Sequence, residues 1–204
     1  MEEINLENAT VLYDPKYLNE SESETIFNLM SDLFKNESRK KVTDKNNVEY
    51  TLKRKTMVLI DKDIDKNIIP KIWGDDVKVI EFMPDLLNIK HKLETDLNYK
   101  FNICLANYYN TGKNGIGWHS DNEEKGSTSC IASLSLGSER NFSFRKKNTN
   151  DVCQSLKLHH GSLLVMGLGC QENYEHSLRA DKLCREPRLN LTFRLFDSER
   201  YMKY

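Results

Sequence analysis

The chain has 204 residues, with 30 Lys or Arg and 31 Asp or Glu, so its formal net charge at pH 7 is -1. Its length and its 38% hydrophobic content predict a single domain with a sizeable core. No apolar run approaches the roughly 20 residues that a membrane-spanning helix needs, and the mean hydropathy is -0.66. Because the first residues, MEEINL, lack the basic-then-apolar pattern of a secretory signal, we expect neither a membrane protein nor a secreted one.

The cysteines argue against two further classes of protein. They are five in number and at least 14 residues apart in the sequence. They are Cys104, Cys130, Cys153, Cys170 and Cys184. Because no CxxC pair occurs, we expect no disulfide framework and no zinc finger, but buried thiols in a reducing, intracellular compartment. The sequence leaves nucleus and cytoplasm undecided.

Helical signals dominate residues 1–100. Apolar residues recur at helical spacing over 26–34, directly after a serine- and glutamate-rich start at 21–24, and this predicts an amphipathic helix. The same spacing predicts a second helix over 85–97. The stretch 39–76 between them is polar and lysine-rich and follows neither period clearly.

Residues 101–204 instead show short strands separated by glycine-bearing or polar turns. The predicted strands are 102–109, 129–136, 141–145, 162–166 and 188–196. Many short strands behind a helical start favour an α+β fold, namely a β-sandwich or jelly roll with the N-terminal helices packed on one side. No linker or repeat separates the two halves, so we expect 1–100 and 101–204 to form one domain.

Three side chains in the second half have the spacing of a metal site. His119 and Asp121 stand at i and i+2, so in an extended strand both project from the same face. His176 follows 55 residues after Asp121. Two histidines and one carboxylate that leave coordination positions open form the facial triad of non-haem Fe(II) oxygenases. Taken alone, the HxD pair also fits a polar strand without a metal.

The last predicted strand alternates strictly between polar and apolar residues. Its polar face carries Arg188, Asn190, Thr192 and Arg194. This face either meets solvent or directs two guanidiniums into the mouth of a barrel, where each needs an anion. A dicarboxylate co-substrate beside the iron would supply that anion, because arginine matches carboxylates in bidentate geometry. Asn107 and Tyr109 form another i, i+2 pair and add hydrogen-bonding groups.

Five segments, in this order, resemble the AlkB family of Fe(II)- and 2-oxoglutarate-dependent dealkylases, and most closely its DNA-repair branch. They are NICLANYYNTGKNGIGWHSDNE, IASLSLGSERNFSFRKK, LHHGSLLVMG, YEHSL and EPRLNLTFRLF. The 12-residue step from His176 to Arg188 is also similar to that of the family. The resemblance implies a double-stranded β-helix. It makes 101–204 the Fe(II)/2-oxoglutarate dioxygenase core and 1–100 the helices and the nucleotide-recognition segment.

The resemblance also implies the cofactors, which are Fe(II), 2-oxoglutarate and O2. His119, Asp121 and His176 would hold the iron. Arg188, assisted by Tyr109, would pair with the distal carboxylate of 2-oxoglutarate. The pocket would be completed by Asn107, Asn190, Thr192 and Arg194. 2-Oxoglutarate would be oxidised to succinate and carbon dioxide, and the N-methyl group of the base would leave as formaldehyde.

A base must leave the stack and enter a pocket for this chemistry. The resemblance implies that Trp73 offers it an aromatic face, although a packed core residue is the alternative interpretation. Glu123 resembles the acidic residue that reads the exocyclic amine of adenine or cytosine, and a solvated glutamate is its alternative. Asn122 stands where the repair branch often carries an acid, which leaves the preferred lesion open.

Basic residues at 53–55 stand where the family has a basic loop, so we expect Arg54 and Lys55 to contact the nucleic-acid backbone. Members that act on duplex DNA insert an apolar residue into the base stack, upstream of this loop. The equivalent stretch, 44–50, has no phenylalanine, and only Val48 or Tyr50 could take that part. The sequence therefore does not choose between single- and double-stranded substrates.

The expected function is oxidative demethylation of N-alkylated bases such as 1-methyladenine and 3-methylcytosine in DNA, by a monomer. Demethylation of RNA with the same iron site is the first alternative. A nucleic-acid-binding protein without turnover is the second, and a β-sandwich without chemistry is the third. The third leaves two inward-facing arginines unexplained.

Overall fold

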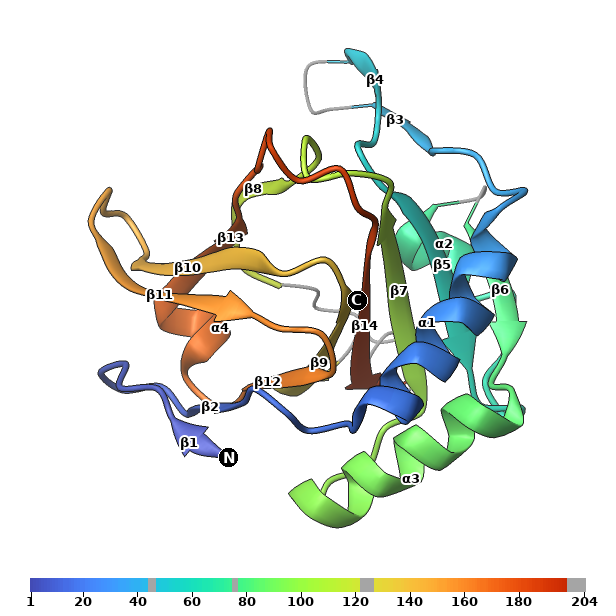
Figure 1. The fold of residues 1–204 in the computed structure, drawn as a ribbon, viewed down its shortest axis with the longest axis horizontal. Coiled ribbons are helices and arrows are strands. Elements are labelled where there is room, and N and C mark those ends of the chain that lie inside the picture. Colours follow the sequence, from blue (N-terminus) through green and yellow to red (C-terminus); the bar gives the residue numbers. More distant parts are fainter. Residues whose placement is uncertain (44–46, 75–76, 122–126, 198–204) are drawn as a thin grey trace.

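The computed structural model describes residues 1–43, 47–74, 77–121 and 127–197 and consists of two facing β-sheets with helices packed on one side (Figure 1). The large sheet has the order β1-β2-β12-β9-β14-β7-β5-β6. Its strands are β1 (Glu2–Glu3), β2 (Val11–Asp14), β12 (Ser162–Met166), β9 (Ser127–Gly137), β14 (Arg188–Leu195), β7 (Ile103–Tyr109), β5 (Lys55–Ile60) and β6 (Lys78–Glu81). This architecture confirms the predicted jelly roll.

The small sheet has the order β11-β10-β13-β8, and all its pairings are antiparallel. Its strands are β11 (Val152–Leu158), β10 (Arg140–Lys146), β13 (Tyr174–Leu178) and β8 (Ile116–His119). A short helix, α4 (Cys170–Asn173), leads directly into β13. A separate hairpin of β3 (Lys41–Thr43) and β4 (Glu49–Thr51) stands above the sheets in Figure 1.

Both predicted helices are confirmed, as α1 (Glu20–Phe34) and α3 (Pro84–Leu97). A capping box explains where α1 begins, since the Asn19 side chain accepts from the Glu22 N–H and the Glu22 carboxylate accepts from the Asn19 N–H. The helices α1 and α3 lie on the face of the large sheet that points away from the small sheet (Figure 1). There their apolar faces form one core with the sheet, and burial of this area holds the layers together.

The five predicted strands correspond to β7, β9, β10, β12 and β14. The first hundred residues also contribute strands, because β1, β2, β5 and β6 extend the large sheet at both ends. The strand β5 lies in the stretch that showed no clear period. Its residues Met57 to Ile60 are all buried, so the strand appears in the sequence as a continuous apolar run without alternation.

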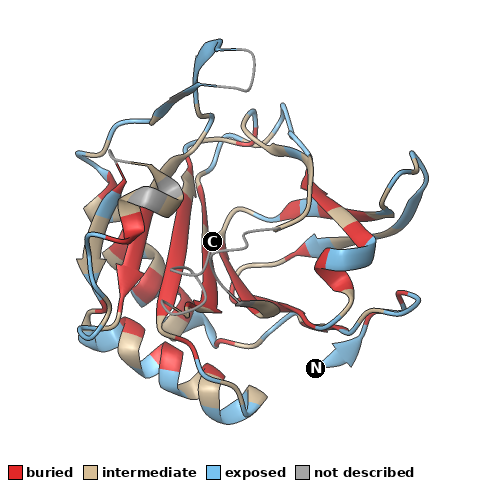
Figure 2. Cartoon of the chain, turned by 180° about the vertical axis from the view of Figure 1, so that it is seen from behind, coloured by how far each residue is buried: buried red, intermediate tan, exposed pale blue. Residues whose placement is uncertain are grey.

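A second core lies between the sheets, where Tyr109, Ile131, Phe142, Phe144 and Met166 meet. Figure 2 shows that buried residues follow the strands, while the β3–β4 hairpin is exposed. One further helix, α2 (Ile69–Trp73), precedes β6. In the described part of the chain no helix has both the length and the apolarity to cross a membrane.

Candidate active site

A cavity of about 500 Å³ opens between the two sheets. The large sheet contributes polar side chains of β7 and β14, the small sheet contributes side chains of β8 and β13, and the β3–β4 hairpin and α2 add Tyr50 and Ile72 at its rim. This volume is within the range of small-molecule sites. The polar face of the last strand therefore points into a cavity and not into solvent, which decides between the two interpretations of its alternation.

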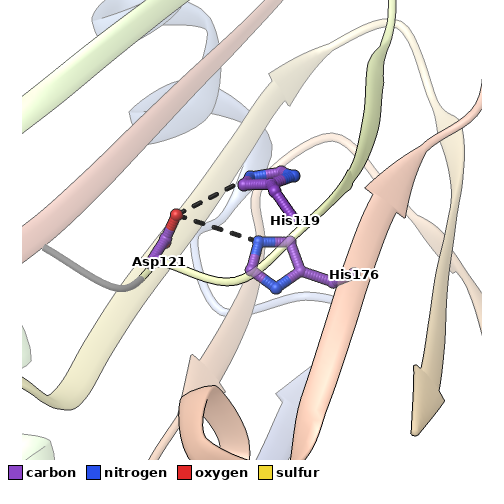
Figure 3. A group of neighbouring side chains, drawn as sticks. All are labelled: His119, Asp121 and His176. Atoms are coloured by element: carbon purple, nitrogen blue, oxygen red, sulfur yellow. Dashed lines mark ion pairs between the residues drawn. The ribbon is translucent and has the colours of Figure 1, made fainter. Parts of the chain in front are cut away.

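His119, Asp121 and His176 meet in this cavity, and their ligand atoms all lie within 4.8 Å of one another. Oδ1 of Asp121 is 3.6 Å from Nε2 of His119 and 4.0 Å from Nε2 of His176. Dashed lines in Figure 3 mark these two contacts. The two histidines are register partners on adjacent strands, which brings their rings to 4.4 Å between centroids. Pairing of β8 with β13 thus assembles a site from residues far apart in the sequence.

The protonation of these groups suits a cation. Nδ1 of His119 donates to the carbonyl oxygen of Gly117 at 2.8 Å, so Nε2 keeps its lone pair for a metal. Burial lowers the pKa of His176 to about 4 and keeps that ring neutral. Burial also raises the pKa of Asp121, but the positive charge around it, first that of Arg194, outweighs burial, so the pKa lies below its usual value.

The backbone of Asp121 is held by a residue that the sequence did not indicate. Its N–H donates to Oε1 of Gln171 at 2.8 Å, and the buried Gln171 in turn donates from Nε2 to Sδ of Met166 at 3.5 Å. The preceding Ser120 donates to the carbonyl oxygen of Tyr174 at 2.8 Å. The backbone that carries Asp121 is therefore held by contacts from α4 and β13, 50 or more residues later in the chain.

Arg188 is a buried guanidinium on the cavity wall. Its side chain donates to Oγ of Ser135 at 2.8 Å and lies 5.5 Å from the ring centre of Tyr109. Its Nε has no hydrogen-bond partner, and no carboxylate within the described residues pairs with it. Burial lowers the pKa of Arg188 to about 10, which still leaves it charged at neutral pH. A buried cation of this kind calls for an anion from outside the chain.

The other polar residues of β14 have partners within the protein. Arg194 donates from Nη2 to Oδ2 of Asp121 at 2.9 Å. Asn190 donates to Oγ of Ser133 and to the Leu134 carbonyl oxygen, and Thr192 donates to the Leu105 carbonyl oxygen. All three line the cavity. Arg194 therefore braces the metal-ligand carboxylate in this structure.

Arg54 and Lys55, the two residues of the basic stretch 53–55 that we expected to contact nucleic acid, point in different directions. Arg54 turns into the cavity and donates from Nε to Oδ1 of Asn107 at 2.7 Å. Lys55 turns the other way and donates from Nζ to the carbonyl oxygen of Phe34, at the end of α1, at 2.7 Å. Lys55 thus caps a helix in the structure, because the C-terminal carbonyls of helices attract cations.

The residues expected to contact the base are described in part. Trp73 is the last residue of α2, and its neighbour Ile72 lines the cavity. Asn122 and Glu123 lie outside the described residues. Tyr50, one of the two candidates for insertion into a base stack, lines the cavity rim and is half exposed, and Val48 is also exposed.

One further group of metal-ligand type occurs among the described residues, formed by Glu20, Glu24 and His160. Nδ1 of His160 accepts the N–H of Gly137 at 2.8 Å. Its Nε2 therefore carries the proton of a neutral ring and has no lone pair for a metal. The cavity site is the better metal site for this reason.

Comparisons with known proteins agree with this geometry. The family model of the 2OG-Fe(II) oxygenase superfamily matches residues 10–194. Alpha-ketoglutarate-dependent dioxygenase alkB homolog 3 of Mus musculus is 37% identical over 122 residues, which cover 55% of this chain and 43% of that protein. DNA oxidative demethylase ALKBH2 of Homo sapiens is 38% identical over 133 residues, covering 61% and 48%. The matches thus span less than half the length of these relatives.

Two solved structures share the fold. The structure of OsALKBH1 has a TM-score of 0.64 at 20% identity and covers 90% of this chain and 97% of that one. A prolyl hydroxylase from Trichoplax adhaerens has a TM-score of 0.59 at 14% identity, covering 95% and 86%. The family match extends over most of the chain. It includes His119, Asp121 and His176 as well as Arg188 and Arg194 of β14. The chain belongs to the 2OG-Fe(II) oxygenase superfamily.

Proposed function

We propose that this protein is an Fe(II)- and 2-oxoglutarate-dependent dioxygenase that removes methyl groups from N-alkylated bases, with 1-methyladenine and 3-methylcytosine in DNA as substrates. The observation that carries the proposal is the presence of two unsatisfied sites in one cavity. These are a three-ligand cation site with an open side and a buried guanidinium without an anion. A metal and a dicarboxylate satisfy both.

The side chains that line the cavity fit Fe(II) and 2-oxoglutarate. His119, Asp121 and His176 would hold Fe(II) through two neutral imidazoles and one carboxylate. Arg188 would pair with the distal carboxylate of 2-oxoglutarate. Burial raises the pKa of Tyr109, so its phenol stays protonated and can donate to the same carboxylate. Asn190, Thr192 and Arg194 would form the wall behind the co-substrate.

Bound Fe(II) and 2-oxoglutarate supply the activation of O2 by which the N-methyl carbon is oxidised and lost as formaldehyde. The chain's own residues bind and orient. Arg194 holds Oδ2 of Asp121 and leaves Oδ1 toward the histidines. Arg54, fixed on Asn107, places a positive charge at the cavity wall, where it would favour an anion such as a carboxylate of 2-oxoglutarate or a phosphate of the substrate strand.

The base-binding part of the proposal is supported by the names of the relatives, by the resemblance of the sequence to the AlkB family, and by Tyr50, which lines the cavity. The alkB homolog 3 and ALKBH2 matches bear the names of a dioxygenase and a DNA oxidative demethylase. We propose that Trp73 and Tyr50 offer aromatic faces to the flipped base and that Glu123 reads its amino group. A base between aromatic faces gains about 1–3 kcal/mol from stacking.

The test is demethylation with Fe(II), 2-oxoglutarate and O2, read by mass spectrometry on matched single- and double-stranded DNA and RNA oligonucleotides that carry 1-methyladenine or 3-methylcytosine. Loss of the methyl group on DNA supports the proposal. Loss on RNA alone would move the substrate to RNA. Consumption of 2-oxoglutarate without demethylation would support the proposed iron site but refute alkylated bases as the substrate. No consumption, with His176→Ala as the reference, would favour a binding protein without turnover.

A further inference from the structure

A second hollow of about 310 Å³ lies next to the cavity, against β8, the loop before it and the end of β13. Ile116 and Leu178, which are register partners across these strands, line both this hollow and the cavity. The two spaces therefore share a wall made of one pair of side chains. We call the hollow the basic groove and define it by Lys53, Lys113, Ile116, Trp118, Leu178 and Arg179.

All the charged side chains that line the basic groove are positive. Lys53, Lys113 and Arg179 are exposed, and the groove's described lining includes no Asp or Glu. Among the described residues none of the three forms an ion pair with a carboxylate. Other surface lysines do so, for example Lys66 with Glu81 at 2.9 Å and Lys92 with Asp96 at 3.0 Å. For a chain with a net charge of -1, three unpaired cations around one groove form a local anion-binding surface.

The position of the loop that carries Lys113 is set by a buried residue. Arg140 is 1% exposed and donates to the carbonyl oxygens of Asn114 and Arg179. It therefore ties the loop before β8 to the end of β13, and so brings Lys113 and Arg179 to the same groove. Cations held by an ordered backbone lose less conformational freedom when they bind a ligand.

We propose that the basic groove binds the phosphodiester backbone of the nucleic-acid strand whose alkylated base occupies the cavity, an inference that rests on the proposed function. A base in the cavity leaves its phosphates outside, and the groove begins where the cavity wall ends. Trp118 and Ile116 give the groove apolar surface beside its cations, a combination that suits alternating bases and phosphates. Contacts to phosphate position a strand without reading its sequence.

The experiment measures binding separately from turnover. The probe is a fluorescein-labelled 12-nucleotide single-stranded DNA with one central 1-methyladenine. Its anisotropy is titrated with the Mn(II)-loaded full chain at salt concentrations from 50 to 200 mM. The test variant combines Lys53→Gln, Lys113→Gln and Arg179→Gln. The control combines Lys16→Gln, Lys62→Gln and Lys147→Gln, which change the net charge equally at residues that line neither space.

Each phosphate contact to a single strand contributes about 0.7 to the slope of log affinity against log salt, so three contacts contribute about 2. Over this fourfold range of salt the affinity of the unaltered chain should fall about 16-fold more than that of the test variant. The control should keep the original slope. Consumption of 2-oxoglutarate without substrate should stay within about twofold in all variants, since phosphate contacts lie outside the co-substrate site.

Equal slopes for the unaltered chain and the test variant would overturn the groove assignment. Competition by polyglutamate as strong as by an oligonucleotide of equal charge would overturn it as well, because the groove would then bind acidic chains of any kind. The single variant Arg179→Gln, expected to remove about a third of the slope difference, gives the same decision if the triple variant does not fold. A chain that shows the slope but demethylates no oligonucleotide would reject the proposed function and not the groove.

Discussion

Arg194 lies 73 residues after Asp121 in the sequence and binds only one oxygen of its carboxylate. Nη2 of Arg194 donates to Oδ2 at 2.9 Å, while Oδ1 faces the two histidines. The arginine thus fixes the rotation of the carboxylate and favours its charged form. A ligand oriented by a neighbour gives up less freedom when it binds a metal.

We therefore expect Arg194→Met to weaken metal binding about 10- to 100-fold, the usual effect of removing a group that orients a ligand. Arg194→Lys keeps the charge but not the planar geometry, so its metal affinity should lie between those of the unaltered chain and Arg194→Met. Titration of the apo chain with Co(II), followed by its visible absorption, measures this. An unchanged affinity in Arg194→Met would show that the carboxylate needs no such brace.

Gln171 gives a second test of ligand orientation, from the opposite side. Gln171→Leu removes the acceptor of the Asp121 N–H, so the backbone that carries this ligand loses its hydrogen bond and metal affinity should again fall about 10- to 100-fold. Gln171→Glu retains an acceptor oxygen and should recover most of the loss. The same Co(II) titration compares them, and equal affinities for the two variants would contradict the assigned contact.

Arg188→Met should abolish tight binding of 2-oxoglutarate and leave metal binding intact. The expected loss is about 2–5 kcal/mol, because one partner of a buried charge pair is truncated. Calorimetry with 2-oxoglutarate on the Mn(II)-loaded chain measures it, and Ser135→Ala, which removes one hydrogen bond of Arg188, is the mild control. Normal affinity in Arg188→Met would mean that the co-substrate binds elsewhere.

Two lysines of α3 allow a matched test of stability. Lys90 is buried between Asp61 and Glu94, at 3.1 and 3.3 Å, whereas Lys92 meets Asp96 at the surface, at 3.0 Å. Lys90→Met removes the buried cation that Asp61 and Glu94 share and should lower the free energy of unfolding by about 3–5 kcal/mol. Lys92→Met should cost about 0–1 kcal/mol. Urea denaturation of both variants checks the difference, and similar costs would show that burial does not strengthen the Lys90 contacts.

The same cluster predicts a loss of stability in acid. Burial raises the pKa of Glu94, but the Phe101 N–H and Lys90 outweigh it, so the pKa is lower in the folded chain than in the unfolded one. Ionised Glu94 therefore stabilises the folded chain. This stabilisation is complete above pH 4.5, the ordinary pKa of the group, and is lost as the pH falls through the lower pKa of Glu94 in the folded chain. Glu94→Gln should be less stable at pH 7 and should lose less stability between pH 5 and 3. Parallel pH profiles for the two proteins would contradict this assignment.

The sequence predicted what depends on local spacing. Helical spacing placed α1 and α3, and alternation put the polar residues of β14 on one face. His119 ends β8 and Asp121 follows the strand, yet both side chains line the cavity as their spacing indicated. The sequence missed β5 because a strand buried on both faces has no alternation. It also missed Gln171, which carries no local pattern, since a glutamine on a four-residue helix looks like any surface residue.

The sequence by itself therefore determined the kinds of groups present, namely two imidazoles, a carboxylate and two arginines at strand spacing, together with the fold that carries them. Only the tertiary structure decided what each one faces. It turned Arg54 into the cavity and Lys55 onto the end of α1, and it placed Lys113 and Arg179 beside Ile116, where neither pairs with a carboxylate of the described residues. The reason is physical. Spacing along a strand tells which side chains share a face of that strand. Which of the two faces borders the cavity depends on how the sheets pack against each other.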